Sequence, residues 1–267
     1  MRIALITPGF SASASDWCIP VLLDHVRELA REHEVHVFAL RYPHRRDRYT
    51  VYGATVHPCG GADTRGLARG PLLGRAYRAI RAEARRRPFD LYHAFWADEP
   101  GALAVLAGRA AGRPAIVALM GGELVRMPEL GYGGQLSRVN RVLTRLALGR
   151  ATTVTVGSPY LREQALAYVP AERLALQPLG VDTALFSPGR SGGAAPFERG
   201  RFNILQAASL LPIKDHRTSL AALQRLVERH PQVQLHLVGQ GPLRGLLERT
   251  ARQLGVAEQV TFHGAVD

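Results

Sequence analysis

The sequence predicts an α/β protein with two Rossmann-like, doubly wound domains, the second of them incomplete. Short runs rich in Val, Ile and Leu, bounded by Gly or Pro, alternate along the chain with amphipathic stretches of helical length. A stretch rich in Gly, Pro and Ser interrupts the alternation at residues 180–201, after which the alternation resumes. Such alternation is typical of a parallel sheet that is covered by helices on both faces.

The first domain is predicted to span residues 1–179 and to contain seven strands and five helices. Several of the helices begin with Pro in the first turn, where its missing N–H has no intrahelical partner to lose. The strands are predicted at residues 2–7, 34–40, 51–57, 91–94, 115–119, 152–156 and 174–177. The helices are predicted at residues 20–31, 71–87, 100–111, 135–148 and 159–168.

Residues 180–201 are predicted to be a linker, and residues 202–267 the first half of a second domain. Three strands and two helices are only half of a doubly wound fold, and its first strand would have a free edge. We therefore expect the 267-residue chain to be a truncated product. The strands are predicted at residues 202–208, 233–238 and 260–264, and the helices at residues 217–230 and 242–254.

Composition excludes several classes of protein. The apolar run at residues 3–7 is shorter than the ~7 to 15 residues of a signal-peptide core, and no run reaches the ~18 apolar residues of a membrane span. Cys18 and Cys59 form no motif, which indicates a reducing compartment. We expect a cytoplasmic protein, with a peripheral position on the inner membrane face as a variant of that location.

Lys214 is the only lysine among the 34 Lys and Arg residues of the chain. It lies in "LLPIKDH", between the first strand of the second domain and a helix whose predicted N-cap is Asp215. Ligands of open α/β sheets bind at the carboxyl ends of strands, and a helix N-terminus attracts anions. Because Lys is a slimmer cation than Arg, we interpret Lys214 as a ligand of a phosphate or diphosphate; the alternative is a solvated side chain.

The segment "VGQGPLRG" places Gly239, Gly241 and Gly245 between a strand and a helix. It resembles a dinucleotide fingerprint with one extra residue, and no acidic residue ends the following strand. An NAD(P)-dependent oxidoreductase is therefore one hypothesis. A tight turn that lets the helix pack closely on the sheet explains the glycines equally well.

In the first domain, "MGGEL" follows a buried strand and includes Gly121 and Glu123. Gly121 and Gly122 would let a ligand approach closely and Glu123 could accept hydrogen bonds from sugar hydroxyls; a plain turn with an exposed Glu is the alternative. "HEVH" at residues 33–36 is interpreted as a solvated helix end. No motif predicts a metal site.

The formal net charge is +12, and arginines cluster in two places. Four arginines fall on one face of the predicted helix at residues 71–87, and four more crowd the loop at residues 41–48. A solvated face explains them, and contact with an anionic membrane is the alternative. Because no aromatic platform or nucleic-acid motif accompanies them, we expect no nucleic-acid partner. The four helical arginines are Arg75, Arg78, Arg81 and Arg85.

Three segments resemble the GT-B-fold glycosyltransferases of family 4. "PLGVDTALFSP" at residues 178–188 is similar to the "PNGVDxxxFxP" hinge of that family, and "LLPIKDH" to its "xxPxKGH" loop. The stretch from residue 230 to residue 266 resembles the long "HPDxxLxIVGDGPxxxxLexxAxxLGLxdxVxFLGxV" pattern. The acidic E-x7-E segment of the family would follow Asp267, so the resemblance implies that the 267-residue chain by itself is a fragment without transferase activity.

The resemblance implies a retaining, metal-independent transfer of a sugar from a nucleotide-sugar donor to a carbohydrate or lipid-linked acceptor, with no cofactor. Lys214 would hold the donor diphosphate, Gly239 and Gly241 would shape the nucleotide pocket, and Val266 would lie near the base. The implied residues of the acceptor side of the cleft, together with those that "MGGEL" contributes, are Gly9, Phe10, Met120, Gly121 and Glu123.

Two positions depart from the family pattern. Ser209 stands where the family usually has an Arg that partners the Lys, and Met120 stands where a His often contacts the donor sugar. These departures keep open a relative that binds nucleotide sugars without catalysis. No catalytic residue is assigned in the 267 residues, and neither the sugar, the base nor the acceptor follows from the sequence.

Overall fold

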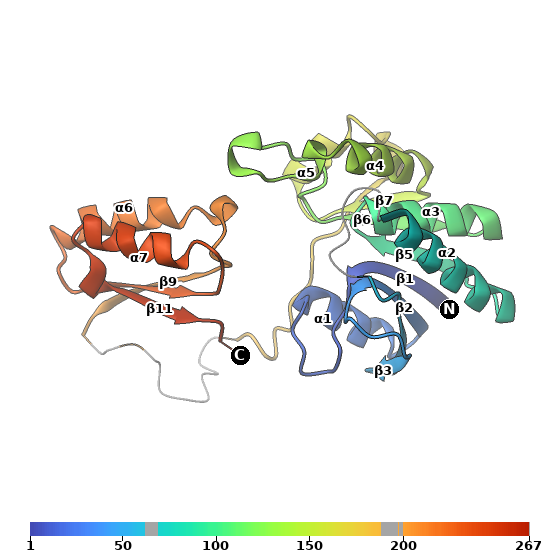
Figure 1. Ribbon diagram of the computed structural model, residues 1–267, viewed down its shortest axis with the longest axis horizontal. Coiled ribbons are helices and arrows are strands. Elements are labelled where there is room, and N and C mark those ends of the chain that lie inside the picture. The colour runs from blue at the N-terminus through green and yellow to red at the C-terminus, as the bar shows by residue number, and fades with distance from the viewer. Residues whose placement is uncertain (62–68, 188–196, 198–199, 267) are drawn as a thin grey trace. The chain divides into compact units, whose positions relative to one another are not determined.

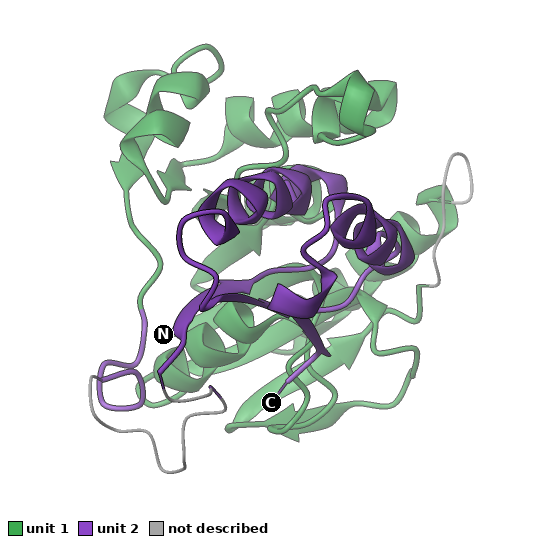
Figure 2. Ribbon diagram, turned by 90° about the vertical axis from the view of Figure 1, so that its left-hand side faces the viewer, with its two compact units in different colours: residues 1–180 green, residues 181–267 purple. Residues whose placement is uncertain are grey.

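The computed structural model describes residues 1–61, 69–187, 197 and 200–266. The chain divides into two compact units, Met1–Gly180 and Val181–Asp267, shown in different colours in Figure 2. Each unit contains its own sheet; the first unit has two apolar cores and the second has one among the described residues.

The first unit is built on an eight-stranded sheet in the order β3-β4-β2-β1-β5-β6-β7-β8. All neighbouring strands are parallel except β3 and β4, which are antiparallel. The strands are β1 (Arg2–Gly9), β2 (Glu34–Tyr42), β3 (Tyr49–Val51), β4 (Ala54–Pro58), β5 (Leu91–Phe95), β6 (Ala115–Leu119), β7 (Thr153–Val156) and β8 (Leu174–Leu176). The predicted parallel α/β architecture is therefore confirmed for this unit.

Helices cover this sheet unequally on its two faces (Figure 1). Of the described helices, only α1 (Pro20–Leu29) contributes to the core that also contains Leu5 and Val37. The other core, which contains Ala4 and Ile6, receives the remaining helices of the unit. These are α2 (Arg69–Arg86), α3 (Glu99–Ala111), α4 (Arg138–Arg150) and α5 (Pro159–Ala165).

One predicted strand is wrong in its extent. Residues 51–57 were expected to be continuous, but Tyr52 and Gly53 form a turn between β3 and β4. Both residues have positive φ angles, 48° and 81°, as the mirror-image turns of two-residue hairpins require. The single Gly in an apolar run was the signal for this hairpin.

The second unit has a three-stranded parallel sheet in the order β11-β10-β9. Its elements are β9 (Phe202–Ala207), α6 (His216–Val227), β10 (Val233–Val238), α7 (Arg244–Gln253) and β11 (Val260–Gly264). The expected free edge of the first strand is confirmed, since β9 pairs only with β10 among the described strands. Phe202 and Leu205 on β9 are 64% and 55% exposed.

A buried charge network lies at the amino ends of β1 and β2. The Arg2 guanidinium is 2.8 Å from both Glu34 and Glu83, and it stacks 4.3 Å from the centroid of the Phe89 ring. Hydrogen bonds from Arg2 and His36 lower the pKa of Glu34 to about 2. The interpretation of "HEVH" as a solvated helix end is wrong for His36, because this residue is buried within β2.

In the described part of the chain, no helix has both the length and the apolar character needed to cross a membrane.

We expect the second unit to open at a lower free energy than the first. The strand β9 has a free edge and large exposed apolar side chains, whereas β1 is paired on both sides and buried. Native-state hydrogen exchange should therefore give protection factors at least about tenfold lower for the amides of β9 than for those of β1. Equal protection in the two strands would contradict this account.

Candidate functional site

The carboxyl ends of β1 and β2 meet at one edge of the first sheet. Gly9 pairs with Tyr42, and a Cβ at Gly9 would lie 3.1 Å from that of Tyr42, so the close approach favours Gly. Phe10 differs from the expectation for a cleft-facing residue, because its side chain is fully buried in the core. The Tyr42 hydroxyl donates to Asp16 at 2.9 Å and so holds the loop before α1.

Glu123 is buried at the carboxyl end of β6. Its Oε1 accepts hydrogen bonds from the backbone N–H groups of Met120, at 2.9 Å, and Ala97, at 3.3 Å, so it links the ends of β5 and β6. Its Oε2 has no partner among the described residues, and burial raises the pKa of this carboxyl group. The alternative of an exposed Glu in a plain turn is therefore wrong. Binding of a sugar hydroxyl by Oε2 stays a prediction.

Two further carboxylates follow β5 at the same edge. Asp98 is the N-cap residue of α3, and burial together with the neighbouring charge of Glu99 raises its pKa. Glu99 is buried and forms ion pairs with Arg41 and Arg69. The preceding Trp96 has a φ of 70°, which is rare for a bulky residue and is typical of functional loops.

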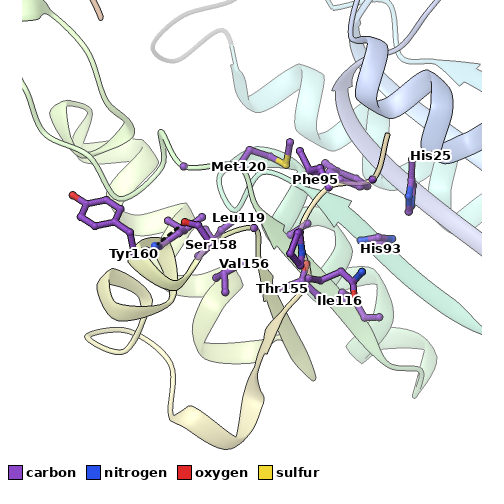
Figure 3. Close-up of a pocket in the computed structure, with 18 residues that line it drawn as sticks. His25, His93, Phe95, Ile116, Leu119, Met120, Thr155, Val156, Ser158 and Tyr160 are labelled. Carbon is purple, nitrogen blue, oxygen red and sulfur yellow. Dashed lines mark hydrogen bonds between the residues drawn. The ribbon is translucent and has the colours of Figure 1, made fainter. Parts of the chain in front are cut away.

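A pocket of about 580 Å³ lies beside the carboxyl ends of β6 and β7, within the first unit (Figure 3). Met120 and Gly121 line it, as do Ser158 and Tyr160 from the start of α5. His25 and His93 lie together at the other end of the lining, with ring centroids 5.6 Å apart. Apolar side chains form most of the remaining wall, among them Phe95, Ile116, Val156 and Leu179.

The two pocket histidines have ring nitrogens that could bind a ligand. The Nε2 atoms of His25 and His93 are buried and have no hydrogen-bond partner among the described residues. Burial lowers the pKa of His25 and lowers that of His93 to about 3. Both imidazoles are therefore neutral at pH 7, and the Nε2 atom of each could form one hydrogen bond with a hydroxyl group.

In the second unit, Lys214 lies at the carboxyl side of β9, as predicted from the sequence. It ends a 3-10 turn, η5 (Pro212–Lys214), directly before α6. The side chain is exposed, and no acidic group of the described residues forms an ion pair with it. The predicted N-cap is confirmed, because Asp215 accepts a hydrogen bond from the Thr218 N–H at 3.4 Å.

Gly239 and Gly241 let the loop after β10 pack directly against the segment that follows β9. A Cβ at Gly239 would lie 2.1 Å from the Ala208 carbonyl oxygen, and one at Gly241 would lie 2.5 Å from that of Leu210. Close packing against the backbone of residues 208–210 therefore explains Gly239 and Gly241, rather than the close packing of a helix on the sheet that the sequence suggested, and no such approach constrains Gly245. Ser209 and Val266, the other predicted donor residues, are exposed at the same end of this sheet.

The arginines of α2 do not form one open stripe. Arg75 donates to the carbonyl oxygens of Cys59, at 2.6 Å, and Gly60, at 3.3 Å, so it links α2 to the end of β4. Arg81 is half-buried, and only Arg78 and Arg85 of the four are exposed.

Comparison with known proteins identifies the family. Residues 19–180 match the model described as "Glycosyl transferase 4-like domain", which is more than half of the chain. The chain belongs to this family. Residues 194–267 match a second model, "Glycosyl transferases group 1". The family resemblance inferred from the motifs is confirmed.

Among curated relatives, a GDP-mannose-dependent α-(1-6)-phosphatidylinositol monomannoside mannosyltransferase of Mycolicibacterium smegmatis is 35% identical over 173 residues, which are 63% of this chain and 44% of the relative. A glycosyltransferase EpsF of Bacillus subtilis, described as putative, is 37% identical over 98 residues, 35% of this chain and 26% of the relative. The chain thus spans less than half the length of these relatives.

Solved structures confirm the fold. Sucrose-phosphate synthase from Thermosynechococcus elongatus superimposes with a TM-score of 0.70 at 17% identity, over 100% of this chain and 71% of that one. The lipopolysaccharide glycosyltransferase WaaG gives a TM-score of 0.64 at 16% identity, over 99% of this chain and 70% of that one.

Sequence reasoning missed the histidine pair and the two carboxylates after β5. His93 lies in a strand whose neighbours are apolar, and His25 lies on the inner face of α1. A polar residue in a strand expected to be buried on both faces was the available signal for His93. Nothing in the spacing of residues 25 and 93 shows that their rings meet.

Stability should fall as the pH drops from 7 to 5. The pKa of His57 is lowered to about 4 and that of His93 to about 3, mainly by burial. Below pH ~6.5 these two histidines bind protons in the unfolded chain but not yet in the folded protein. Their contribution to the free energy of unfolding is therefore fully present above pH ~6.5 and is lost progressively as the pH falls toward about 4. Urea unfolding can be followed by the fluorescence of Trp17 and Trp96, which both lie in the first unit. Between pH 7 and pH 5 the free energy of unfolding should fall by roughly 2 to 4 kcal/mol.

The substitution His93→Gln should remove about half of this pH dependence. His44→Gln, which changes an exposed histidine, is the matched control and should leave the dependence of the free energy of unfolding on pH unchanged. An unchanged slope in His93→Gln would show that His93 is not kept neutral by burial.

Proposed function

We propose that this chain binds a nucleotide-diphosphate sugar and is part of a glycosyltransferase that moves the sugar to a hydroxyl group of a carbohydrate or lipid-linked acceptor. Membership of the glycosyl transferase 4-like family supports this proposal. Because the mannosyltransferase relative is named as GDP-mannose-dependent, GDP-mannose is the first donor that we propose.

The observation that carries the proposal is the position of Lys214. It is exposed directly before the N-terminus of α6, at the carboxyl side of β9. A helix N-terminus and an ammonium group both favour an anion, and together they suit a diphosphate. The lysine stem lets the charge reach between two phosphate groups, where the wider guanidinium of Arg would need room on both sides.

For the reaction, we propose retention at the anomeric carbon and no metal ion. Lys214 and the helix N-terminus would stabilise the charge that develops on the leaving diphosphate, which is the electrostatic role that a cation has in other transferases. On the acceptor side, Oε2 of Glu123 and the pocket lined by Met120 and Gly121 are the groups that we propose for acceptor hydroxyls. The proposed location is the cytoplasm, with peripheral contact at the inner membrane face.

A relative that binds nucleotide sugars without catalysis is the second candidate. Ser209 and Met120, which replace the Arg and His common in the family, favour it. The two candidates share donor binding and differ in product formation. Detection of a glycosylated product, rather than of binding, separates them.

Lys214→Ala should weaken the binding of GDP-mannose by about 1.5 to 3 kcal/mol, because a charge-assisted hydrogen bond is lost. Isothermal titration calorimetry with GDP-, UDP- and ADP-sugars and with NAD(P) measures this loss and ranks the donors. Lys214→Arg should also lose affinity, because the slim shape of the cation matters as well as its charge.

Arg225→Ala is the matched control, since it removes one exposed cation from the other end of the same helix. Its affinity should equal that of the unchanged protein. Equal affinities of Lys214→Ala and Arg225→Ala would return Lys214 to the role of a solvated side chain. Tighter binding of NAD(P) than of any nucleotide sugar would contradict the proposed function.

A further inference from the structure

Trp96, the first residue after β5, has a backbone conformation that few bulky residues adopt. Its φ of 70° lies in the left-handed region, where Cβ crowds the following carbonyl oxygen. Tyr52 and Asp215 are the other non-glycine residues with a positive φ in the described part of the chain; a hairpin turn explains the first and an N-cap position the second. Trp96 is in neither setting, so its strained conformation calls for another explanation.

Three contacts hold the backbone around Trp96. Its N–H donates to the carbonyl oxygen of Ala118 on β6 at 3.0 Å, and its carbonyl oxygen accepts from the N–H of Gly101 on α3 at 3.0 Å. The next N–H along the chain, that of Ala97, donates to Oε1 of Glu123 at 3.3 Å. Strained residues persist only where the surrounding structure determines their conformation. The direction in which the Trp96 side chain leaves the backbone is therefore fixed.

The core covers only part of the indole ring of Trp96. The residue is half-buried and packs against the core that contains Leu5 and Phe10. Its N–H forms no hydrogen bond with the described residues, and the ring makes no aromatic contact with them, whereas Phe38 and Phe89 pack ring against ring. The indole is thus anchored on the core and remains partly accessible to a ligand.

Carboxyl groups lie on both sides of this ring in the chain and in the fold. Glu123 binds the peptide that follows Trp96, and its Oε2 is buried without a partner among the described residues. Asp98 comes two residues after Trp96, and burial raises the pKa of its carboxyl group. Glu99, by contrast, is paired with two arginines. Carboxyl oxygens accept hydrogen bonds from hydroxyl groups, so Glu123 and Asp98 suit a ligand that carries hydroxyls.

We propose that Trp96 binds the acceptor by stacking on a pyranose ring, whose hydroxyl groups donate to Oε2 of Glu123 and to Asp98. One face of a pyranose ring is lined by C–H groups, and an indole ring offers a large, rigid apolar surface to it. Few precisely placed polar groups beside an aromatic wall are typical of small-molecule sites. This inference rests on the proposed function and narrows its acceptor to a sugar ring.

An alkyl chain and an acyclic polyol would each fit only half of this arrangement. An alkyl chain on the indole would leave Oε2 of Glu123 buried without a hydrogen bond, which is costly. A polyol would satisfy the carboxyl oxygens, but it has no rigid apolar face to place on the ring and would lose more conformational freedom on binding. A pyranose ring carries both parts on one rigid frame.

The test is the binding of methyl α-mannopyranoside, methyl α-glucopyranoside and methyl α-galactopyranoside to the 267-residue chain without any sugar donor. In Trp17→Phe, Trp96 is the one remaining tryptophan of the sequence. Its emission should shift to the blue on binding of at least one of the glycosides, because the ring loses contact with water. Mannitol, which has the hydroxyl groups without the ring, should leave the emission unchanged at the same concentration.

Ligand-observed NMR gives the dissociation constant for each variant. Trp96→Leu should weaken the binding of the same glycoside by about tenfold or more, whereas Trp96→Phe, which keeps a smaller aromatic face, should weaken it by about threefold or less. A purely structural role of the ring would give these two variants similar affinities. Tyr77→Leu is the matched control, because it removes another half-buried ring of the first unit that packs on the other core. It should bind within about twofold of the unchanged protein.

Three results would overturn this inference: no binding of the three glycosides at about 100 mM, equal affinities of Trp96→Leu and Trp96→Phe, or an equal emission change with mannitol. Lys214→Ala should leave glycoside binding unchanged, because no donor is present in this test. A chain that binds the glycosides but no nucleotide sugar would contradict the proposed function alone. A chain that binds a nucleotide sugar but none of the glycosides would contradict the role of Trp96 alone.

Discussion

Burial of β1 on both faces is the constraint on which the first unit depends. Successive side chains of a strand point to opposite faces, so Ala4 and Ile6 enter one core while Leu5 enters the other. A strand that is apolar on both sides is stable only between two layers of helices. Parallel neighbours then follow, because each crossover places a helix on one face and brings the next strand back in the same direction. The carboxyl ends of the parallel strands consequently meet at one edge, where the candidate site lies; only β3, which is antiparallel to β4, ends at the other edge among the described strands.

The two edges of this sheet have opposite polar chemistry. At the amino edge, the buried cation of Arg2 is neutralised by Glu34 and Glu83, and removal of one partner would leave an uncompensated charge in the interior. At the carboxyl edge, by contrast, Oε2 of Glu123 is buried without a partner among the described residues, as is Nε2 of His93, which lies in the middle of β5 and lines the pocket. Unpaired buried polar atoms are costly in a native protein, and they are common where a ligand completes the hydrogen bonds. The amino edge therefore serves stability, and the carboxyl edge is the place to look for binding.

The extent to which the sequence predicts this structure depends on the range of the interactions. Local rules were sufficient for the alternation of strands and helices and for the N-cap at Asp215, because periodicity and capping involve residues only a few positions apart. They failed at Phe10, which lies in a loop yet is fully buried, because its environment comes from other elements. They also failed for His25 and His93, whose ring contact joins residues 68 positions apart (93 minus 25). A pocket built from such contacts has no signature in a single sequence.

In the second unit, a backbone constraint positions the loop that carries Lys214, the residue that we propose as a ligand of the donor diphosphate. Gly239 and Gly241 let the chain after β10 lie directly against residues 208–210, and any Cβ there would collide with carbonyl oxygens. This contact fixes the start of the loop that ends with Lys214, while the Gln206 side chain donates to the Lys214 carbonyl oxygen at 3.1 Å and holds its other end. The lysine stem itself remains exposed and able to move. In a chain whose other basic residues are all arginine, a fixed backbone with a slim and flexible cation is a combination suited to the narrow space between two phosphate groups.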